Sequence, residues 1–197
     1  MADGRMDMFA HSPPGDDLFG QPPISGLRQE EEFVSLQEER ALIDRINASK
    51  LSPFRFQQWT GKRLTHSYGW SYDFQTGKFA PTDPVPEWLR PLRARAECFA
   101  GLARGELVQA LLIRYDPGAG IGWHRDRPVF RDVVGISLGE AATMRFRQRN
   151  RDHFKRVNVP LPPRGIYHLS GEVRHEWEHS IAEMPAPRWS ITFRSLV

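Results

Sequence analysis

Short apolar segments separated by turn residues dominate the second half of this chain. They cover residues 107–115, 121–124, 133–138, 142–147, 155–160, 165–169, 177–182 and 188–195, with Gly, Pro and Asp between them. Short strands at this close spacing are typical of antiparallel sandwiches and double-sheet jelly rolls. We therefore predict a double-stranded β-helix, the jelly-roll architecture, over residues 107–197.

The residues before this region predict two helices. Ser35 and Glu38 form a capping-box signature ahead of an apolar face, which predicts a helix over about 36–47. A second helix is expected over about 87–101, where Pro91 either bends the helix or marks its start. The predicted fold class is α+β, mainly β, with N-terminal helices ahead of the jelly roll.

The charge of the chain is divided unevenly. Residues 1–32 contain two Arg and seven acids, whereas the remaining residues contain 25 basic and 17 acidic side chains, a net charge of +8. Residues 1–25 also hold several Pro and Gly, so we expect a disordered acidic tail there and a folded domain over 26–197. Of the 27 basic residues, 23 are Arg, whose planar fork suits carboxylates and phosphates.

Composition also excludes several classes of protein. Cys98 is the single cysteine, which excludes an intramolecular disulfide and a multi-cysteine zinc or iron–sulfur site. No apolar run approaches the length of a membrane span, and the N-terminus lacks the apolar core of a signal peptide. We expect a soluble, cytoplasmic, monomeric protein without membrane contact.

Three residues are candidates for a metal site. His124 and Asp126 are two positions apart at the end of a predicted strand, so their side chains point to the same face. His179 lies in the penultimate predicted strand and is the best candidate for a third ligand. Two His and one carboxylate form the facial triad that binds Fe(II) in non-haem oxygenases. The pair His124 and Asp126 alone would more often be a surface histidine near a turn.

The last predicted strand carries a second pattern. Arg188, Ser190, Thr192 and Arg194 share one strand face because their separations are even. The two Arg are about 20 Å apart along the strand, so with side chains angled inward they can bracket a small diacid. The alternative is a pair of solvated arginines on an edge strand.

In this order, the motifs resemble the AlkB family of Fe(II)- and 2-oxoglutarate-dependent dioxygenases. The matching motifs are Tyr115-Asp-Pro-Gly118, Trp123-His124-Arg-Asp126, His179 and Arg188-x5-Arg194, within a resemblance that covers about residues 26–197. The resemblance implies that His124, Asp126 and His179 hold iron. It also implies that Arg188 binds the distal carboxylate of 2-oxoglutarate, that Tyr115 helps to bind it, and that Arg194 lines the same pocket nearer the metal.

The implied reaction couples decarboxylation of 2-oxoglutarate to hydroxylation of a nearby carbon, with O2 as the second cosubstrate. An N-alkyl group hydroxylated in this way collapses and restores the base. The chain departs from DNA-repairing members at three positions: Ile113 and Ser190 each replace an Asn, and Pro128, after Arg127, replaces an acid. Ser190 still lies among the expected cosubstrate contacts. The run 171–179 also looks like members that act on RNA.

A competing motif occurs at residues 175–179. His175-Glu-Trp-Glu-His179 satisfies the two zinc-protease patterns H-E-x-x-H and H-x-x-E-H. That interpretation requires a substantial helix, for which Gly171 and Pro185 leave little room. It would also leave His124, Asp126 and the arginine pair unexplained.

Basic and aromatic residues favour nucleic acid as the substrate. Arg145, Arg147, Arg149 and Arg151 alternate and would form one basic strand face suited to phosphates, unless they belong to a solvated hairpin. Trp59, Tyr68, Trp70 and Tyr72 lie in a basic segment, which in AlkB relatives forms a lid over the target nucleotide. Flipped bases stack on aromatic faces, although these rings could instead be core. The expected substrate contacts are Tyr68, Trp70, Tyr72, Arg63 and Arg127, and the expected lid lies within residues 26–106.

We therefore predict an Fe(II)/2-oxoglutarate dioxygenase that dealkylates bases in DNA, with RNA as a second possible substrate. One alternative is a tRNA-modifying or protein-directed oxygenase of the same fold. A non-catalytic basic jelly roll that binds nucleic acid is the non-enzyme alternative.

Overall fold

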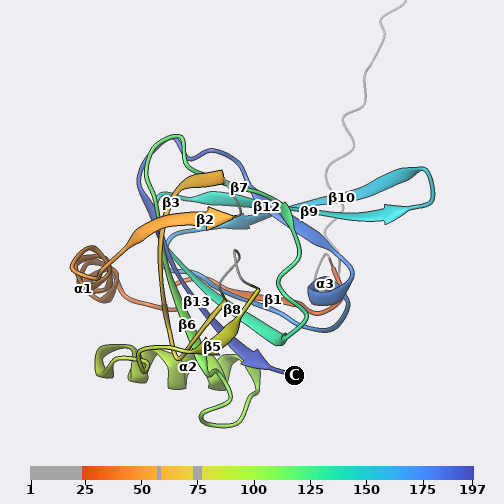
Figure 1. The fold of residues 1–197 in the computed structure, drawn as a ribbon. Helices are drawn as coiled ribbons and strands as arrows, with labels where there is room; N and C mark the ends of the chain where they lie inside the picture. Colours follow the sequence, from red (N-terminus) through yellow and green to blue (C-terminus); the bar gives the residue numbers. More distant parts are fainter. Residues whose placement is uncertain (1–23, 57–58, 73–76) are drawn as a thin grey trace, which may run out of the picture.

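Two antiparallel sheets face each other and form the framework of the molecule (Figure 1). The computed structural model describes residues 24–56, 59–72 and 77–197. The larger sheet has the strand order β1-β11-β8-β13-β6-β3-β2, and the smaller sheet has the order β10-β9-β12-β7. A separate hairpin joins β4 to β5.

The bounds of the strands and helices follow the chain. The strands are β1 (Leu27–Glu30), β2 (Ser52–Phe56), β3 (Trp59–Tyr68), β4 (Trp70–Tyr72), β5 (Phe79–Pro81), β6 (Gln109–Tyr115), β7 (Ile121–His124), β8 (Phe130–Gly139), β9 (Ala142–Asn150), β10 (His153–Leu161), β11 (Ile166–Leu169), β12 (Glu178–Ile181) and β13 (Arg188–Leu196). The helices are α1 (Leu36–Asn47), the 3-10 turn η1 (Glu87–Leu89), α2 (Arg90–Ala100) and α3 (Gly171–His175). The jelly-roll prediction is confirmed, because β6 to β13 correspond one by one to the predicted segments.

The expected helices form where the sequence places them. The Ser35 hydroxyl accepts from the Glu38 backbone N–H, and the Glu38 carboxylate accepts from the Ser35 backbone N–H, so the capping box is complete. The second helix begins with η1, and Pro91 lies in the first turn of α2, where its missing N–H costs nothing.

One expectation for the first 80 residues needs correction. Residues 1–23 of the predicted tail lie outside the described residues, but Ile24 is buried in the core and the Ser25 carbonyl accepts from Val173, so both belong to the fold. Residues 52–56 and 59–68 form β2 and β3, which extend the larger sheet, where β3 pairs with β6 and protects its edge.

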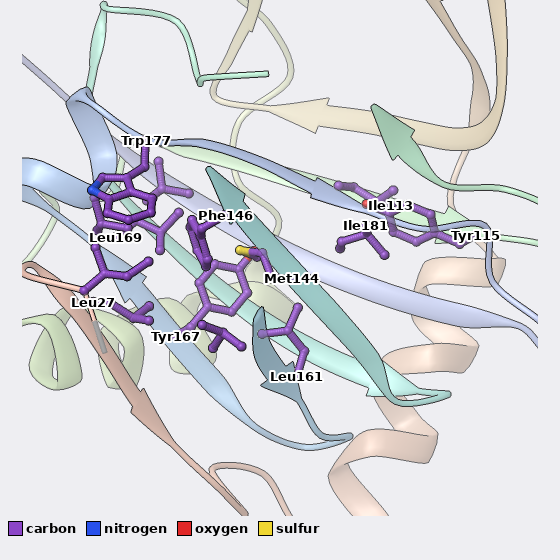
Figure 2. Close-up of a cluster of buried hydrophobic side chains, with 14 of the residues drawn as sticks. Leu27, Ile113, Tyr115, Met144, Phe146, Leu161, Tyr167, Leu169, Trp177 and Ile181 are labelled. Carbon is purple, nitrogen blue, oxygen red and sulfur yellow. The ribbon is translucent and has the colours of Figure 1, made fainter. Parts of the chain in front are cut away.

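Apolar side chains fill both faces of the larger sheet. One cluster lies between the two sheets and includes Phe146, Tyr167 and Trp177, as Figure 2 shows. The other packs α1 and α2 against the opposite face through residues such as Ile46 and Leu92. Position 135 requires glycine, because a Cβ there would lie 2.1 Å from the Tyr167 ring. A polar side chain that enters this apolar layer between the two sheets is therefore removed from water.

Candidate metal centre and substrate cleft

Three metal-binding side chains converge between the sheets. His124 ends β7, Asp126 follows it by two residues, and His179 lies opposite His124 on the paired strand β12. Because opposite residues of neighbouring antiparallel strands share a face, the two rings point the same way, with centroids 4.3 Å apart. One ligand atom from each residue lies within 4.8 Å of the others. The three residues that the sequence singled out could therefore hold one metal ion.

The protonation states suit a metal ion. His124 Nδ1 lies 2.9 Å from the Gly122 carbonyl oxygen, which can only accept, so Nδ1 carries the proton and Nε2 keeps its lone pair. Burial lowers the pKa of both histidines, and for His179, where the charge of His124 adds to burial, the pKa falls to about 3. Burial alone would raise the pKa of Asp126, but Arg194 and the two histidines outweigh it and hold that pKa well below its usual range. Two neutral imidazoles and one carboxylate are the ligand set of non-haem Fe(II) sites.

Arg194 fixes the orientation of Asp126. Its Nε and Nη2 lie 3.0 and 2.8 Å from Asp126 Oδ1, and its Nη1 donates to Gln109 at 3.1 Å. Asp126 Oδ2 instead lies 3.6 Å from His179 Nε2. The carboxylate therefore turns one oxygen to Arg194 and the other to His179, a candidate metal ligand. The sequence predicted Arg194 as a cosubstrate contact, and its observed partner is the Asp126 carboxylate.

Arg188 is a buried guanidinium with donors to spare. Its side chain is 1 % exposed, and Nη2 donates to the Ser137 hydroxyl at 2.9 Å. Nε and Nη1 are buried and have no partner among the described residues, and the Tyr115 ring centroid lies 5.1 Å from the guanidinium carbon. An unpartnered buried cation is costly, and its planar fork matches a carboxylate, so these donors indicate an anion site. Ser190 is buried on the same face of β13.

Tyr167 lies in the same region as both arginines. Burial raises the pKa of Tyr167 to about 12, and the charges of Arg188, Arg194 and Asp126 all act on its hydroxyl. The phenol therefore stays protonated at neutral pH and remains a hydrogen-bond donor. No motif singled out this residue.

A cleft of about 1300 Å³ opens beside His124, Asp126 and Arg194. Its walls are β7 and the residues after it, β2 with the inner face of β3 and β6, part of the β4–β5 hairpin, and α3. Three of the five predicted substrate contacts line it: Arg63, Tyr72 and Arg127. The Arg127 guanidinium lies 4.2 Å from the centroid of the Tyr72 ring. The cleft is basic and partly aromatic next to the candidate metal site.

The other two predicted substrate contacts lie elsewhere. Tyr68 packs against the core on the helix side of the larger sheet, and Trp70 stacks on Phe79 with ring centroids 4.9 Å apart. Neither lines the cleft, so both aromatic rings serve packing, the alternative that composition could not exclude. The side chain of Trp59 lies outside the described residues.

No sequence pattern pointed to Arg174, which lies on α3. It is 3 % exposed, lines the cleft, and donates through Nη2 to the carbonyls of Arg127 and Phe130 at 2.5 and 2.6 Å. It therefore holds the segment that follows Asp126. An arginine in a five-residue helix carries no distinguishing pattern, so no sequence signal could have found it.

The zinc-protease interpretation is wrong. His175 ends α3, whereas His179 lies on β12, so the two do not share a helix face. His179 is instead grouped with His124 and Asp126.

A match to a protein family identifies the class of enzyme. Residues 28–194 match the model of the 2OG-Fe(II) oxygenase superfamily. The chain belongs to this superfamily. As a member it is a dioxygenase that uses Fe(II), 2-oxoglutarate and O2, which confirms the predicted enzyme class and cofactors. The neutral histidines and the unpartnered donors of Arg188 fit these groups.

Among individual proteins, this 2OG-Fe(II) oxygenase is similar to members of the AlkB family. It is 27% identical over 217 residues to the alpha-ketoglutarate-dependent dioxygenase AlkB of Escherichia coli (strain K12), a match that covers 96% of this chain and 97% of that protein. It is 31% identical over 165 residues to the tRNA (carboxymethyluridine(34)-5-O)-methyltransferase alkbh8 of Xenopus tropicalis. That match covers 81% of this chain but 25% of the relative, so the chain spans about a quarter of its length.

A solved structure agrees on the fold of the oxygenase. The structure of OsALKBH1 superimposes with a TM-score of 0.66 at 16% identity, covering 89% of this chain and 99% of that chain. Among the described residues, no helix is long and apolar enough to cross a membrane.

Proposed function

We propose that this oxygenase oxidatively dealkylates alkylated bases in DNA, releasing succinate and carbon dioxide. The observation that carries the proposal is the basic, partly aromatic cleft that opens directly beside the candidate iron ligands. A base outside its stack needs aromatic contact, and its flanking phosphates need cations. Tyr72, Arg63 and Arg127 provide both kinds of group in the cleft. The relative from E. coli, whose match covers nearly all of both chains, is named an alpha-ketoglutarate-dependent dioxygenase AlkB.

Each site residue has a distinct role in this proposal. His124, Asp126 and His179 hold Fe(II), which together with 2-oxoglutarate supplies O2-dependent hydroxylation of a C–H bond. Arg188 uses its spare donors to hold the distal carboxylate of 2-oxoglutarate, next to the Tyr115 ring. Arg194 keeps one oxygen of Asp126 occupied, so that the other remains directed toward the histidines.

The remaining residues position the substrate and exclude water. Arg174 holds the backbone of Arg127 and Phe130, and thereby the wall of the cleft that follows Asp126. Tyr72 and Arg127 form a stacked pair at the same wall, on the side of the β4–β5 hairpin. If the hydroxylated carbon is bonded to a ring nitrogen, its C–N bond breaks, an aldehyde leaves and the base is restored.

Modification of tRNA is the second candidate function. It is favoured by the similarity to alkbh8 of Xenopus tropicalis, which is named a tRNA methyltransferase. It is also favoured by Pro128 and Ser190, which stand where DNA-repairing members carry an acid and an Asn. In this case the hydroxylated carbon would stay attached to the base.

The test uses the full chain with Fe(II), ascorbate and 2-oxoglutarate and a panel of N-methylated single-stranded DNA and tRNA oligomers. Succinate release and product masses are measured together. We expect succinate coupled to loss of the methyl group from DNA, and we expect Asp126→Ala to abolish turnover while oligomer binding persists. Turnover confined to tRNA, with added oxygen retained on the base, would establish the second candidate. Binding without any succinate would instead identify a non-catalytic nucleic-acid-binding protein.

A further inference from the structure

The outer face of the smaller sheet carries arginines on two neighbouring strands. On β9, Met144 and Phe146 are buried in the inter-sheet core, so the alternating side chains of Arg145, Arg147 and Arg149 project from the opposite face. This alternation confirms that Arg145, Arg147 and Arg149 share one strand face, whereas Arg151, expected on the same face, lies in the turn after β9. It leaves open what the face does.

β10 and β7 contribute to the same outer face. On β10, Arg156 is paired with Arg147, and Phe154 is paired with Arg149. On β7, the neighbour of His124 is Trp123, whose ring centroid lies 4.4 Å from the Arg147 guanidinium. We call this set the arginine strip: Trp123, Arg145, Arg147, Arg149, Phe154 and Arg156.

Arg147 is fixed at the centre of the arginine strip. Its guanidinium lies 4.4 Å from the ring of Trp123 and 4.7 Å from that of Phe154, and its Nε donates to Glu178 at 2.6 Å. The two aromatic rings are thus in contact with a guanidinium. These contacts help to hold the Arg147 side chain in place.

The other arginines of the strip keep donors available. Arg149 and Arg156 are exposed and have no carboxylate partner among the residues that the structure describes. Arg145 uses Nε on the Ser180 hydroxyl at 3.1 Å and keeps its two terminal nitrogens. Within the described strands β9, β10 and β12, Glu178 is the acid on this face, against four arginines. Excess guanidinium charge on a preorganised surface suits phosphate groups.

The arginine strip begins at the mouth of the cleft. Trp123 and its neighbour Arg125 both line the cleft, and His124 between them is a candidate iron ligand. From β7 the strip crosses β12 and β9 to β10, three strand spacings or about 14 Å. Figure 1 shows that the far end of the β9–β10 hairpin extends beyond the other strands of the two sheets. The strip is therefore long enough to contact more than one phosphate.

From this continuity we infer that the arginine strip binds the phosphate backbone on one side of the nucleotide whose base enters the cleft. The inference rests on the proposed function and deepens it. It requires the enzyme to bind a strand that extends several nucleotides beyond the target more tightly than a strand with only one nucleotide on each side of the target. The contacts are ionic and independent of base sequence.

The test compares two charge-matched double variants of the full chain. Arg149→Ser with Arg156→Ser removes two cations of the strip and leaves Arg147 and its supports in place. The control, Arg40→Ser with Arg104→Ser, removes two exposed cations from α1 and from the loop after α2. Both are assayed with a single DNA strand of about 15 nucleotides and with a trinucleotide, each containing one N-methylated adenine.

We expect only the strip variant to lose affinity for the long strand. Each phosphate contact contributes about 0.7 to the steepness of log K against log salt concentration, so the loss of two contacts would reduce it by about 1.4. We expect about tenfold weaker binding near 0.1 M salt. Turnover of the trinucleotide should equal that of the wild type, because it does not reach the strip. The control should match the wild type on both substrates.

Two results would overturn the inference, and they are distinguishable. If the strip variant and the control bind the long strand equally, with equal salt slopes, the strip does not contact phosphates although the proposed function stands. If the wild type releases no succinate with either oligomer and binds neither, the proposed function itself fails, and the inference fails with it.

Discussion

Arg174 shows how a single buried side chain can shape the site without touching a metal ligand. Its guanidinium satisfies two carbonyls of the segment after Asp126, and its positive charge also favours the ionised form of the Asp126 carboxyl. Removing a donor from buried carbonyls costs about 1–3 kcal/mol for each group left unpaired. The segment between β7 and β8 therefore depends on α3 for its position.

We expect Arg174→Met to lower the free energy of unfolding by about 2–4 kcal/mol and to weaken divalent metal binding. Urea denaturation and titration with Mn(II), as an Fe(II) substitute, measure the two effects. Arg174→Lys should recover part of both, because one ammonium can still donate to the carbonyls. Arg104→Met is the matched control at an exposed arginine. Metal affinity equal to wild type in a folded Arg174→Met protein would contradict the positioning role.

The metal-free protein should lose stability as the solution becomes mildly acidic. Burial and the charge of His124 lower the pKa of His179 to about 3 in the folded protein, whereas an unfolded chain has the ordinary value of about 6.5. Between these values the unfolded chain binds the additional proton, so the free energy of unfolding falls as pH decreases from about 6.5 toward 3. The slope contributed by one such group is at most about 1.4 kcal/mol per pH unit.

Denaturation with urea at pH 7 and pH 5, in the presence of a chelator, measures this loss. His179→Gln should be less sensitive to pH than the wild type, since the titrating group is gone. The matched change His153→Gln, at an exposed position of the β9–β10 hairpin, should leave the sensitivity unchanged. Equal slopes for wild type and His179→Gln would show that His179 keeps an ordinary pKa.

At the scale of elements, α1 depends on its first turn. The capping box satisfies backbone donors at its start, and the Glu39 carboxylate accepts from the Gly139 backbone N–H at 2.8 Å, which ties the helix to the end of β8. Ser35→Ala should therefore lower the free energy of unfolding by about 1 kcal/mol. Ser35→Thr keeps a capping hydroxyl and should retain most of that stability. A difference below about 0.3 kcal/mol between the two variants would mean that tertiary contacts alone hold the helix.

Elements whose pattern is local could be predicted from the sequence. β6, β8 and β13 alternate or run apolar between turn residues, and Ser35 with Glu38 defines the start of α1. β2 and β3 could not be assigned in the same way. β3 pairs with the edge of β6, which lies more than 40 residues further along the chain, and β2 pairs with β3. The aromatic composition of both segments fits a lid as well as a strand.

The residues of the candidate site also differ in whether a local sequence pattern predicts them. His124, Asp126, Arg188 and Arg194 follow a strand period of two, so their shared faces could be predicted. Tyr68 and Trp70 could not be separated from Tyr72, because an aromatic ring has the same sequence signal in a core and in a cleft. Arg174 and Tyr167 depend on packing between distant segments.

At the scale of the whole molecule, two layers cover the faces of the larger sheet and bury the charged side chain of Arg188. Helices pack on one face and the smaller sheet on the other, so Arg188 lies in the interior with Nε and Nη1 unpartnered. A ligand that binds only the folded state stabilises it by mass action, by about 2.7 kcal/mol at 100 times its dissociation constant. A dicarboxylate that pairs with Arg188 should therefore stabilise the entire protein.

We expect 2-oxoglutarate with Mn(II), under anaerobic conditions, to raise the melting temperature of the wild type by several degrees, since about 1 kcal/mol corresponds to roughly 2–4 °C at this chain length. A 2-oxo acid with one carboxylate should give a much smaller increase, because it can reach the metal but offers nothing to Arg188. Arg188→Lys, which keeps the charge but not the fork, should reduce the difference between the two acids. Equal stabilisation of the wild type by both acids would show that the distal carboxylate does not bind Arg188, and that the spare donors of this buried arginine serve another anion.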